Sequence, residues 1–312
     1  MKFVEGAIYL SVAALFVATL LPGQTNRRID RNHNLSINTS GDVEKCSDIH
    51  VTSNGEIAQA AESLTFRRSE APVLELNGLD RGNIRVRGWN NPDFSMETCK
   101  IAVADDRASA EQALRGISVT RSAGHISASG PSSDSVQWMV YFIVNAPKDA
   151  ALDLETRNGP ISVRDISGNV KARATNGPIA LDNVSGTVDA HTQNGPIAFT
   201  GSSGDVHLNA QNGPIAVKIG GQMWNGSQLE ARTVNGPVSF TAPDNFQSAV
   251  RIESAGGSPI SCHLGACRNA WTDASRDQRV LQLNGSGNAI RLSTENGPVS
   301  IGTPGPSKTR FM

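Results

Sequence analysis

The sequence predicts an all-β chain whose repeats coil into a parallel β-solenoid, with about 18 residues per coil. Three observations support this fold class. The tetrapeptide Asn-Gly-Pro-Ile recurs at a fixed step of 18 residues, starting at Asn158, Asn176, Asn194 and Asn212. Apolar and polar residues alternate on both sides of each tetrapeptide, as in strands that bury one face. The same step also aligns apolar residues in columns, which an array of antiparallel hairpins would not predict.

Composition limits the classes of function. The chain has 312 residues and a formal net charge of -1, so it lacks the basic field expected of a nucleic-acid-binding protein. Residues 7–21 form an apolar run that ends at Pro22-Gly23. This run is shorter than the ~20 residues that span a bilayer, and its length is typical of a signal-peptide core. We expect residues 1–24 to be a signal peptide. The alternatives are a membrane anchor, through which this segment would engage the membrane, and a buried apolar N-terminus.

The segment that follows is interpreted as a polar linker and a β-rich N-terminal cap, residues 25–72. Within it, Ile57–Leu64 is ambiguous, and we interpret it as a short helix. From Val73 the pattern alternates, and one or two helical turns are expected at Ala108–Leu114. The predicted strands are residues 73–78, 83–89, 99–103, 117–120, 125–128 and 136–144. The last of these is apolar on both faces, as expected for a covered strand.

The regular repeats occupy residues 151–219 of a β-solenoid domain that we expect to span residues 73–303. Polar residues between the apolar columns face outward. Two outward columns are Asp153, Lys171, Asp189, His207 and Glu155, Arg173, His191, Asn209. Because the charges alternate in sign along the first coils, we expect pairs between neighbouring coils, such as Asp153 with Lys171 and Asp189 with His207.

The repeat loosens toward the C-terminal end. Residues 220–226 are an insertion that lengthens the step to 23, and residues 249–260 resemble another coil with an altered turn. Residues 267–279 form an excursion that carries Trp271. Residues 280–283 and 289–301 supply the last rungs, and the Pro-rich tail 304–312 is expected to be disordered.

Each residue of the Asn-Gly-Pro turn has a structural interpretation. The asparagine falls on the inward parity of its strand, and its amide is expected to bond to the equivalent amides above and below. Glycine supplies backbone freedom for a sharp corner, and proline fixes φ directly after it. The predicted amide ladder comprises Asn158, Asn176, Asn194, Asn212, Asn235 and Asn296. A polar ridge of stacked turns that binds a glycan is a functional alternative.

The four cysteines, behind a predicted export signal, favour disulfides. Cys262 and Cys267 close a short loop and are expected to pair, which leaves Cys46 with Cys99. A metal site built from Cys262, His263 and Cys267 is the alternative, but it lacks a fourth ligand. We therefore expect no metal and no cofactor.

The sequence contains no catalytic motif of the serine-hydrolase, zinc-protease or Walker type, and no EF-hand loop. Asp153, Asp182 and Asp189 would be the acidic cluster of a β-helix polysaccharide lyase or hydrolase, but we favour a solvated face with charges paired between coils. We predict no catalytic residues. Trp224 and Trp271 lie in insertions, where an exposed ring would contact a sugar, although capping of the core is the simpler interpretation.

Three segments carry a resemblance to a known family: LELNGLDRGNIRVRGW at 74–89, the strand VYFIVNAP, and the serial NGPI and NGPV turns. Together they resemble the bacterial DUF4097-type "putative adhesin" domains, over roughly residues 73–303. The resemblance implies a right-handed β-solenoid at the bacterial envelope, with adhesion proposed as the role. It supplies no catalytic residues.

These observations lead to one functional hypothesis and two alternatives. We expect an exported, non-enzymatic adhesion or binding module of the periplasm or cell surface, with a polysaccharide or an envelope protein as partner. The first alternative is a structural protein that self-assembles through open solenoid ends. The second is a polysaccharide lyase or hydrolase. No particular oligomeric state is predicted.

Overall fold

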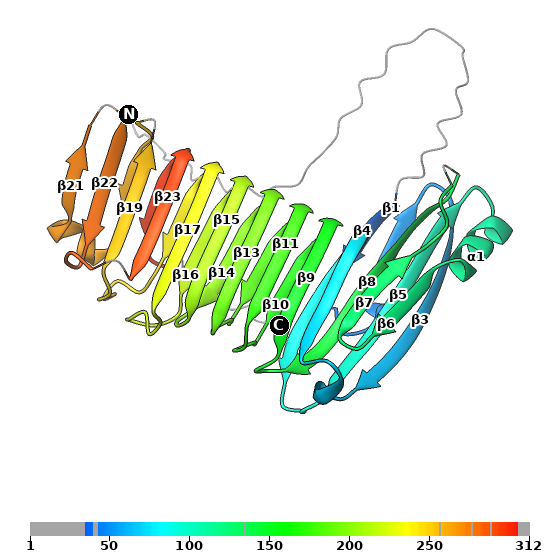
Figure 1. The fold of residues 1–312 in the computed structure, drawn as a ribbon. Coiled ribbons are helices and arrows are strands. Elements are labelled where there is room, and N and C mark those ends of the chain that lie inside the picture. Colours follow the sequence, from blue (N-terminus) through cyan, green and yellow to red (C-terminus); the bar gives the residue numbers. More distant parts are fainter. Residues whose placement is uncertain are drawn as a thin grey trace, which may run out of the picture. The chain divides into compact units, whose positions relative to one another are not determined.

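A computed structural model of the protein describes residues 35–39, 43–133, 135–255, 257–275, 277–287 and 289–304 (Figure 1). The predicted leader, most of the linker and residues 305–312 of the predicted tail lie outside these ranges. The described residues form 24 strands, one α-helix and three short 3-10 helices. The all-β prediction is therefore confirmed, and most strand pairs in the repeat region are parallel.

Each regular coil contributes one strand before its Asn-Gly-Pro turn and one after it. The strands before the turn form what we call the first sheet: β9 (Ala151–Asn158), β11 (Val170–Asn176), β13 (Thr187–Asn194), β15 (Asp205–Asn212) and β17 (Gln228–Asn235). The strands after it form the second sheet: β10 (Ile161–Arg164), β12 (Ile179–Asp182), β14 (Ile197–Gly201), β16 (Ile215–Ile219) and β18 (Val238–Thr241). Each strand pairs in parallel with its equivalent in the next coil, Ile161 opposite Ile179 and Val170 opposite Val188.

The core lies between the two sheets, because each strand directs alternate side chains inward. The predicted apolar columns are buried, from Leu152 through Val206 and from Ile161 through Ile215. Threonines occupy the last inward position before several turns. Their hydroxyls donate to backbone carbonyls of a neighbouring coil, Thr156 to Gly82 and Thr192 to Gly177. These buried polar groups are thus satisfied.

At the N-terminal end, β4 (Val73–Trp89) is one continuous strand that belongs to both sheets. The sequence predicted two separate strands here. Its first part pairs with β9 and its second with β10, and the register shifts between Leu76 and Leu79. Beyond β4, the second sheet continues through β8 (Gln137–Pro147), β5 (Phe94–Ala104) and β3 (Glu56–Phe66). The first continues through β7 (His125–Ser129) and β6 (Ser118–Ser122). A separate pair is formed by β1 (Leu35–Thr39) and β2 (Ile49–Ser53).

The two predicted helices have different outcomes. The helical turns expected at 108–114 are present as α1 (Arg107–Arg115), which Asp106 caps by accepting a bond from the Ser109 amide. The prediction of a helix at 57–64 is wrong, because these residues lie in β3, which pairs with β5 along its whole length. Backbone pairing with a neighbouring strand overrides the helix preference of an Ala- and Glu-rich segment.

The spatial order of the last coils differs from their order in the sequence. The coil of β23 (Ile290–Asn296) and β24 (Val299–Gly302) inserts between β17–β18 and the coil of β19 (Val250–Ala255) and β20 (Ile260–Cys262). The strands β22 (Gln278–Leu283) and β21 (Trp271–Ala274) then pair antiparallel beyond β19 (Figure 1). The chain thus passes over one coil position and returns to fill it.

Candidate functional site

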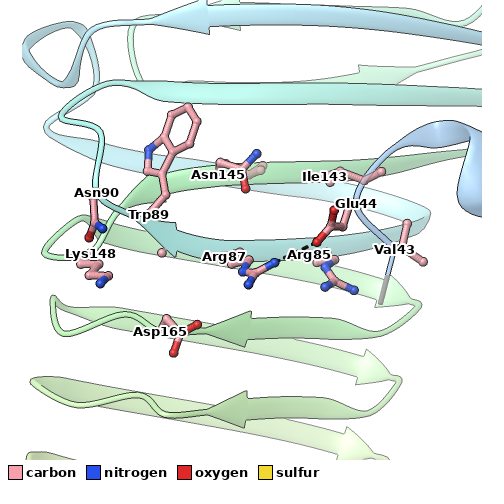
Figure 2. Close-up of a pocket in the computed structure, with 12 residues that line it drawn as sticks. Val43, Glu44, Arg85, Arg87, Trp89, Asn90, Ile143, Asn145, Lys148 and Asp165 are labelled. Carbon is pink, nitrogen blue, oxygen red and sulfur yellow. Dashed lines mark hydrogen bonds and ion pairs between the residues drawn. The ribbon is translucent and has the colours of Figure 1, made fainter. Parts of the chain in front are cut away.

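A hollow of about 580 Å³, which we call the β4 pocket, opens beside the C-terminal end of β4 (Figure 2). Arg85, Arg87 and Trp89 come from β4, Asn145 from β8, and Lys148 from the turn after β8. Glu44, Asn90 and Asp165 complete its polar lining. The pocket therefore lies where the cap meets the first regular coil.

Strand alternation places the arginines in this pocket. Ile84 and Val86 are buried, so Arg85 and Arg87 face outward. The end of β4 is held close to the turn after β10. A Cβ on Gly88 would lie 1.9 Å from the Asp165 carbonyl oxygen, so this position accepts no side chain.

The lining carries three cations and two carboxylates. The Arg87 Nη1 lies 3.0 Å from the Glu44 Oε1. The Trp89 Nε1 donates to the Asp93 carbonyl at 2.9 Å, which orients the indole ring. On the neighbouring strand, burial raises the pKa of Tyr141, and the charge of Arg85 acts against this shift. Sequence reasoning missed this cluster, for which the only signal was two arginines alternating with apolar residues in one strand.

A second hollow, of about 350 Å³, lies beside β19, β21 and β22, and we call it the Trp271 shelf. Its lining residues are Arg251, Asn269, Trp271, Gln282, Gly285 and Ser286. The Trp271 side chain begins β21 and is 57% exposed. An exposed indole surrounded by amide and guanidinium groups can stack on an apolar sugar face while its neighbours bond to hydroxyls.

The other insertion tryptophan belongs to the core. Trp224 is 5% exposed, and its ring meets Phe199 edge-on with centroids 6.2 Å apart. Its backbone amide donates to the Ser248 Oγ at 2.8 Å, which holds the insertion against the coils. The simpler interpretation, capping of the core, is therefore confirmed for Trp224, and the alternative of ligand contact is wrong because the ring is covered.

The six turn asparagines form an amide ladder. Each Nδ2 donates to the Oδ1 of the asparagine in the preceding coil at 2.8–3.0 Å, along Asn158, Asn176, Asn194, Asn212, Asn235 and Asn296. At the first rung, the Asn158 Nδ2 donates instead to the Asp80 carbonyl. All six are exposed, so their predicted inward orientation is wrong. The chain begins to turn after the buried threonine position, which carries the following amide out to the surface.

The turn glycines are required by close stacking of the coils. A Cβ on Gly177, Gly195, Gly213 or Gly297 would lie 2.0–2.2 Å from the carbonyl oxygen of the glycine in the adjacent coil. None of these four has a positive φ. The expected reason, freedom to form a sharp corner, is therefore replaced by a steric one.

Two of the outward acidic residues, Asp153 and Asp182, are paired with arginines of neighbouring coils. Asp153 contacts the Arg173 Nη2 at 2.7 Å, and Asp182 contacts the Arg164 Nε at 3.1 Å. Pairing between coils is thus present, but Asp153 meets the diagonal Arg173 rather than the predicted Lys171. His207 lies 3.2 Å from Asp205 in its own strand instead of pairing with Asp189.

Both expected disulfides, Cys46–Cys99 and Cys262–Cys267, are present. The alternative metal site is excluded, because the thiols of Cys262 and Cys267 are consumed in a disulfide. Among the described residues, no group of three or more His, Cys, Asp or Glu side chains is placed to hold a metal ion. In the same part of the chain, no helix is both long and apolar enough to cross a membrane.

Comparison with known proteins identifies the family. Similar solved structures include a "putative cell adhesion protein" from Clostridium sporogenes (14% identity, 79% of this chain and 100% of that chain, TM-score 0.30) and a "putative adhesin" from Bacteroides fragilis (9%, 78% and 97%, 0.35). Another is a "putative adhesin" from Parabacteroides distasonis (11%, 79% and 98%, 0.33). The search of curated proteins found no match. The family model Toastrack DUF4097 matches residues 33–302, and the chain therefore belongs to the Toastrack DUF4097 family.

Proposed function

We propose that this protein is an exported, non-enzymatic binding module of the bacterial envelope that contacts a glycan through the Trp271 shelf. The observation that carries the proposal is the exposed Trp271 ring above a hollow lined by Asn269, Gln282 and Arg251. Of the four tryptophans in the sequence, this is the one most exposed in the structure. Exposed aromatic rings are costly to leave in water and mark interaction sites when polar groups surround them.

The scaffold supports a rigid recognition surface. We propose a right-handed β-solenoid of about 18 residues per coil over residues 73–303, preceded by a β-rich cap. The register offset of 18 residues between paired strands, as for Ile161 and Ile179, supports this coil size. β21 extends this scaffold by antiparallel pairing with β22, so Trp271 is held on a strand rather than on a loop.

The strands at both ends favour a binding module over a self-assembling one. At the C-terminal end, the first sheet finishes in the antiparallel β22 and β21, and the second in the three-residue β20. At the N-terminal end, the antiparallel β3 and β6 are outermost. Parallel coils that stack end to end would need open parallel edges, and short or antiparallel edge strands protect against such pairing.

The disulfides support export, because disulfides persist in oxidising compartments such as the periplasm and the cell surface. We propose that the N-terminal segment directs export and is either cleaved or retained as an inner-membrane anchor. N-terminal sequencing of the protein isolated from its native envelope separates these two outcomes.

A glycan array probed with the mature protein and with Trp271→Ala tests the proposed function. We expect the wild type to bind at least one envelope polysaccharide, and Trp271→Ala to lose that binding. Met223→Ala is the matched control, because this side chain is also exposed (49%) but lies away from the shelf residues. Binding that survives Trp271→Ala contradicts the assigned site. Reducing ends or unsaturated products released from the bound polysaccharide would contradict the non-enzymatic role.

A further inference from the structure

We propose that the β4 pocket is a second binding site, specific for the carboxylate of an acidic saccharide such as a uronate, and independent of the Trp271 shelf. Arg85 and Arg87 lie side by side on β4 in this pocket, and Lys148 lines it farther along, near Asn90 (Figure 2). None of these residues takes part in the core or in the amide ladder.

The strand register concentrates positive charge here. Arg87 pairs in register with Asn145 of β8 on one side and with Arg164 of β10 on the other. Adjacent strands are ~4.8 Å apart, and like charges directly opposite each other are destabilising. Asp182 balances Arg164, and Glu44 contacts Arg87. These charges are thus partly offset, and an anion that reaches Arg87 competes with Glu44 for its guanidinium.

The Arg87–Glu44 pair shows the chemistry that the pocket accepts. A carboxylate oxygen of Glu44 already lies 3.0 Å from the Arg87 Nη1. Both side chains are well exposed, at 43% and 67%, and such pairs contribute little to stability. A ligand carboxylate that bonds to two guanidinium nitrogens can therefore replace Glu44. Glu44 then acts as an internal competitor for the site.

The remaining lining suits a sugar ring. Asn90 and Asn145 offer amide donors and acceptors for hydroxyl groups, and Trp89 is oriented by its bond to the Asp93 carbonyl. The volume of about 580 Å³ falls in the range of small-ligand sites. The pocket opens to solvent beside β4, so an end group or an exposed residue of a longer polymer could enter it.

Isothermal titration calorimetry of the mature protein with digalacturonate tests the assignment, with neutral digalactose and inorganic phosphate as comparison probes. We expect digalacturonate to bind more tightly than either. Arg85→Gln and Arg87→Gln are each expected to weaken binding by roughly ten-fold or more, since each removes a charged hydrogen-bond donor. Glu44→Gln is expected to strengthen binding, because the competitor is removed.

Two controls make the result decisive. Lys171→Gln removes an exposed cation from the first sheet and should leave binding unchanged. Thermal melting confirms that each variant folds. If an arginine variant does not fold, Lys148→Gln is used in its place, because Lys148 is exposed. Equal affinity of the wild type and the arginine variants overturns the proposal. Tighter binding of digalactose or phosphate than of digalacturonate also overturns it.

Discussion

Replacing Gly213 with alanine should destabilise the protein strongly, although the change adds one methyl group at a surface turn. The new Cβ would lie 2.0 Å from the Gly195 carbonyl oxygen and 2.6 Å from its carbon. Ordinary contact begins at 3.4 Å, so the adjacent coil would have to retreat by about 1.4 Å (3.4 − 2.0). Strands of one sheet are ~4.8 Å apart, so a local rotation cannot absorb this displacement.

The retreat would also stretch the hydrogen bonds that cross the turn. The Gly195 amide donates to the Asn212 carbonyl at 3.0 Å, and the Asn212 Nδ2 donates to the Asn194 Oδ1 at 2.9 Å. Overpacking costs about 1–3 kcal/mol and each weakened bond about 1 kcal/mol. We therefore expect Gly213→Ala to lower the free energy of unfolding by about 3–5 kcal/mol.

Urea unfolding followed by circular dichroism measures this loss, with Gly220→Ala as the matched control. A Cβ on Gly220 meets nothing within 4 Å, so that variant should stay within about 0.5 kcal/mol of the wild type. The reasoning is refuted if Gly213→Ala and Gly220→Ala unfold at the same urea concentration.

Three further predictions concern the core, the ladder and the disulfides. Trp224→Ala should cost about 3–5 kcal/mol in urea unfolding, because its buried ring leaves a cavity; a cost under about 1 kcal/mol would contradict its place in the core. Asn296 ends the amide ladder, and the described contacts give its side chain one ladder bond where the inner asparagines have two. Deamidation begins when the Gly297 backbone nitrogen attacks the Asn296 carboxamide and ammonia is lost. We expect Asn296 to be the first ladder asparagine to deamidate, and peptide mapping after mild alkaline incubation measures this. Replacing Cys46 and Cys99 with alanine should lower the free energy of unfolding by about 2–5 kcal/mol, because their disulfide joins positions 53 residues apart. An unchanged melting temperature would show that this disulfide adds nothing to the stability.

The repeats could be predicted from the sequence because their information is local and periodic. Alternation assigns each residue to the core or the surface, and a fixed step places like residues in register. Ile161 opposite Ile179 therefore follows from counting alone. The disulfide of Cys262 with Cys267 was predictable for a similar reason, since the two cysteines are close in the chain.

The remaining features depend on contacts between distant segments. β3 became a strand because β5 was available to pair with it. The last coil lies between β17 and β19, where Asn296 extends the amide ladder and Gly297 stacks closely on Gly236.

The sequence by itself determined the class of fold, the apolar columns and the family, because these depend on periodicity and turn chemistry. Only the tertiary structure decided the spatial order of the coils, the outward position of the ladder amides and the grouping of Arg87 with Lys148. The physical reason is that register within a repeat is encoded every 18 residues. The neighbours of a cap strand or an insertion are selected only when the whole chain packs.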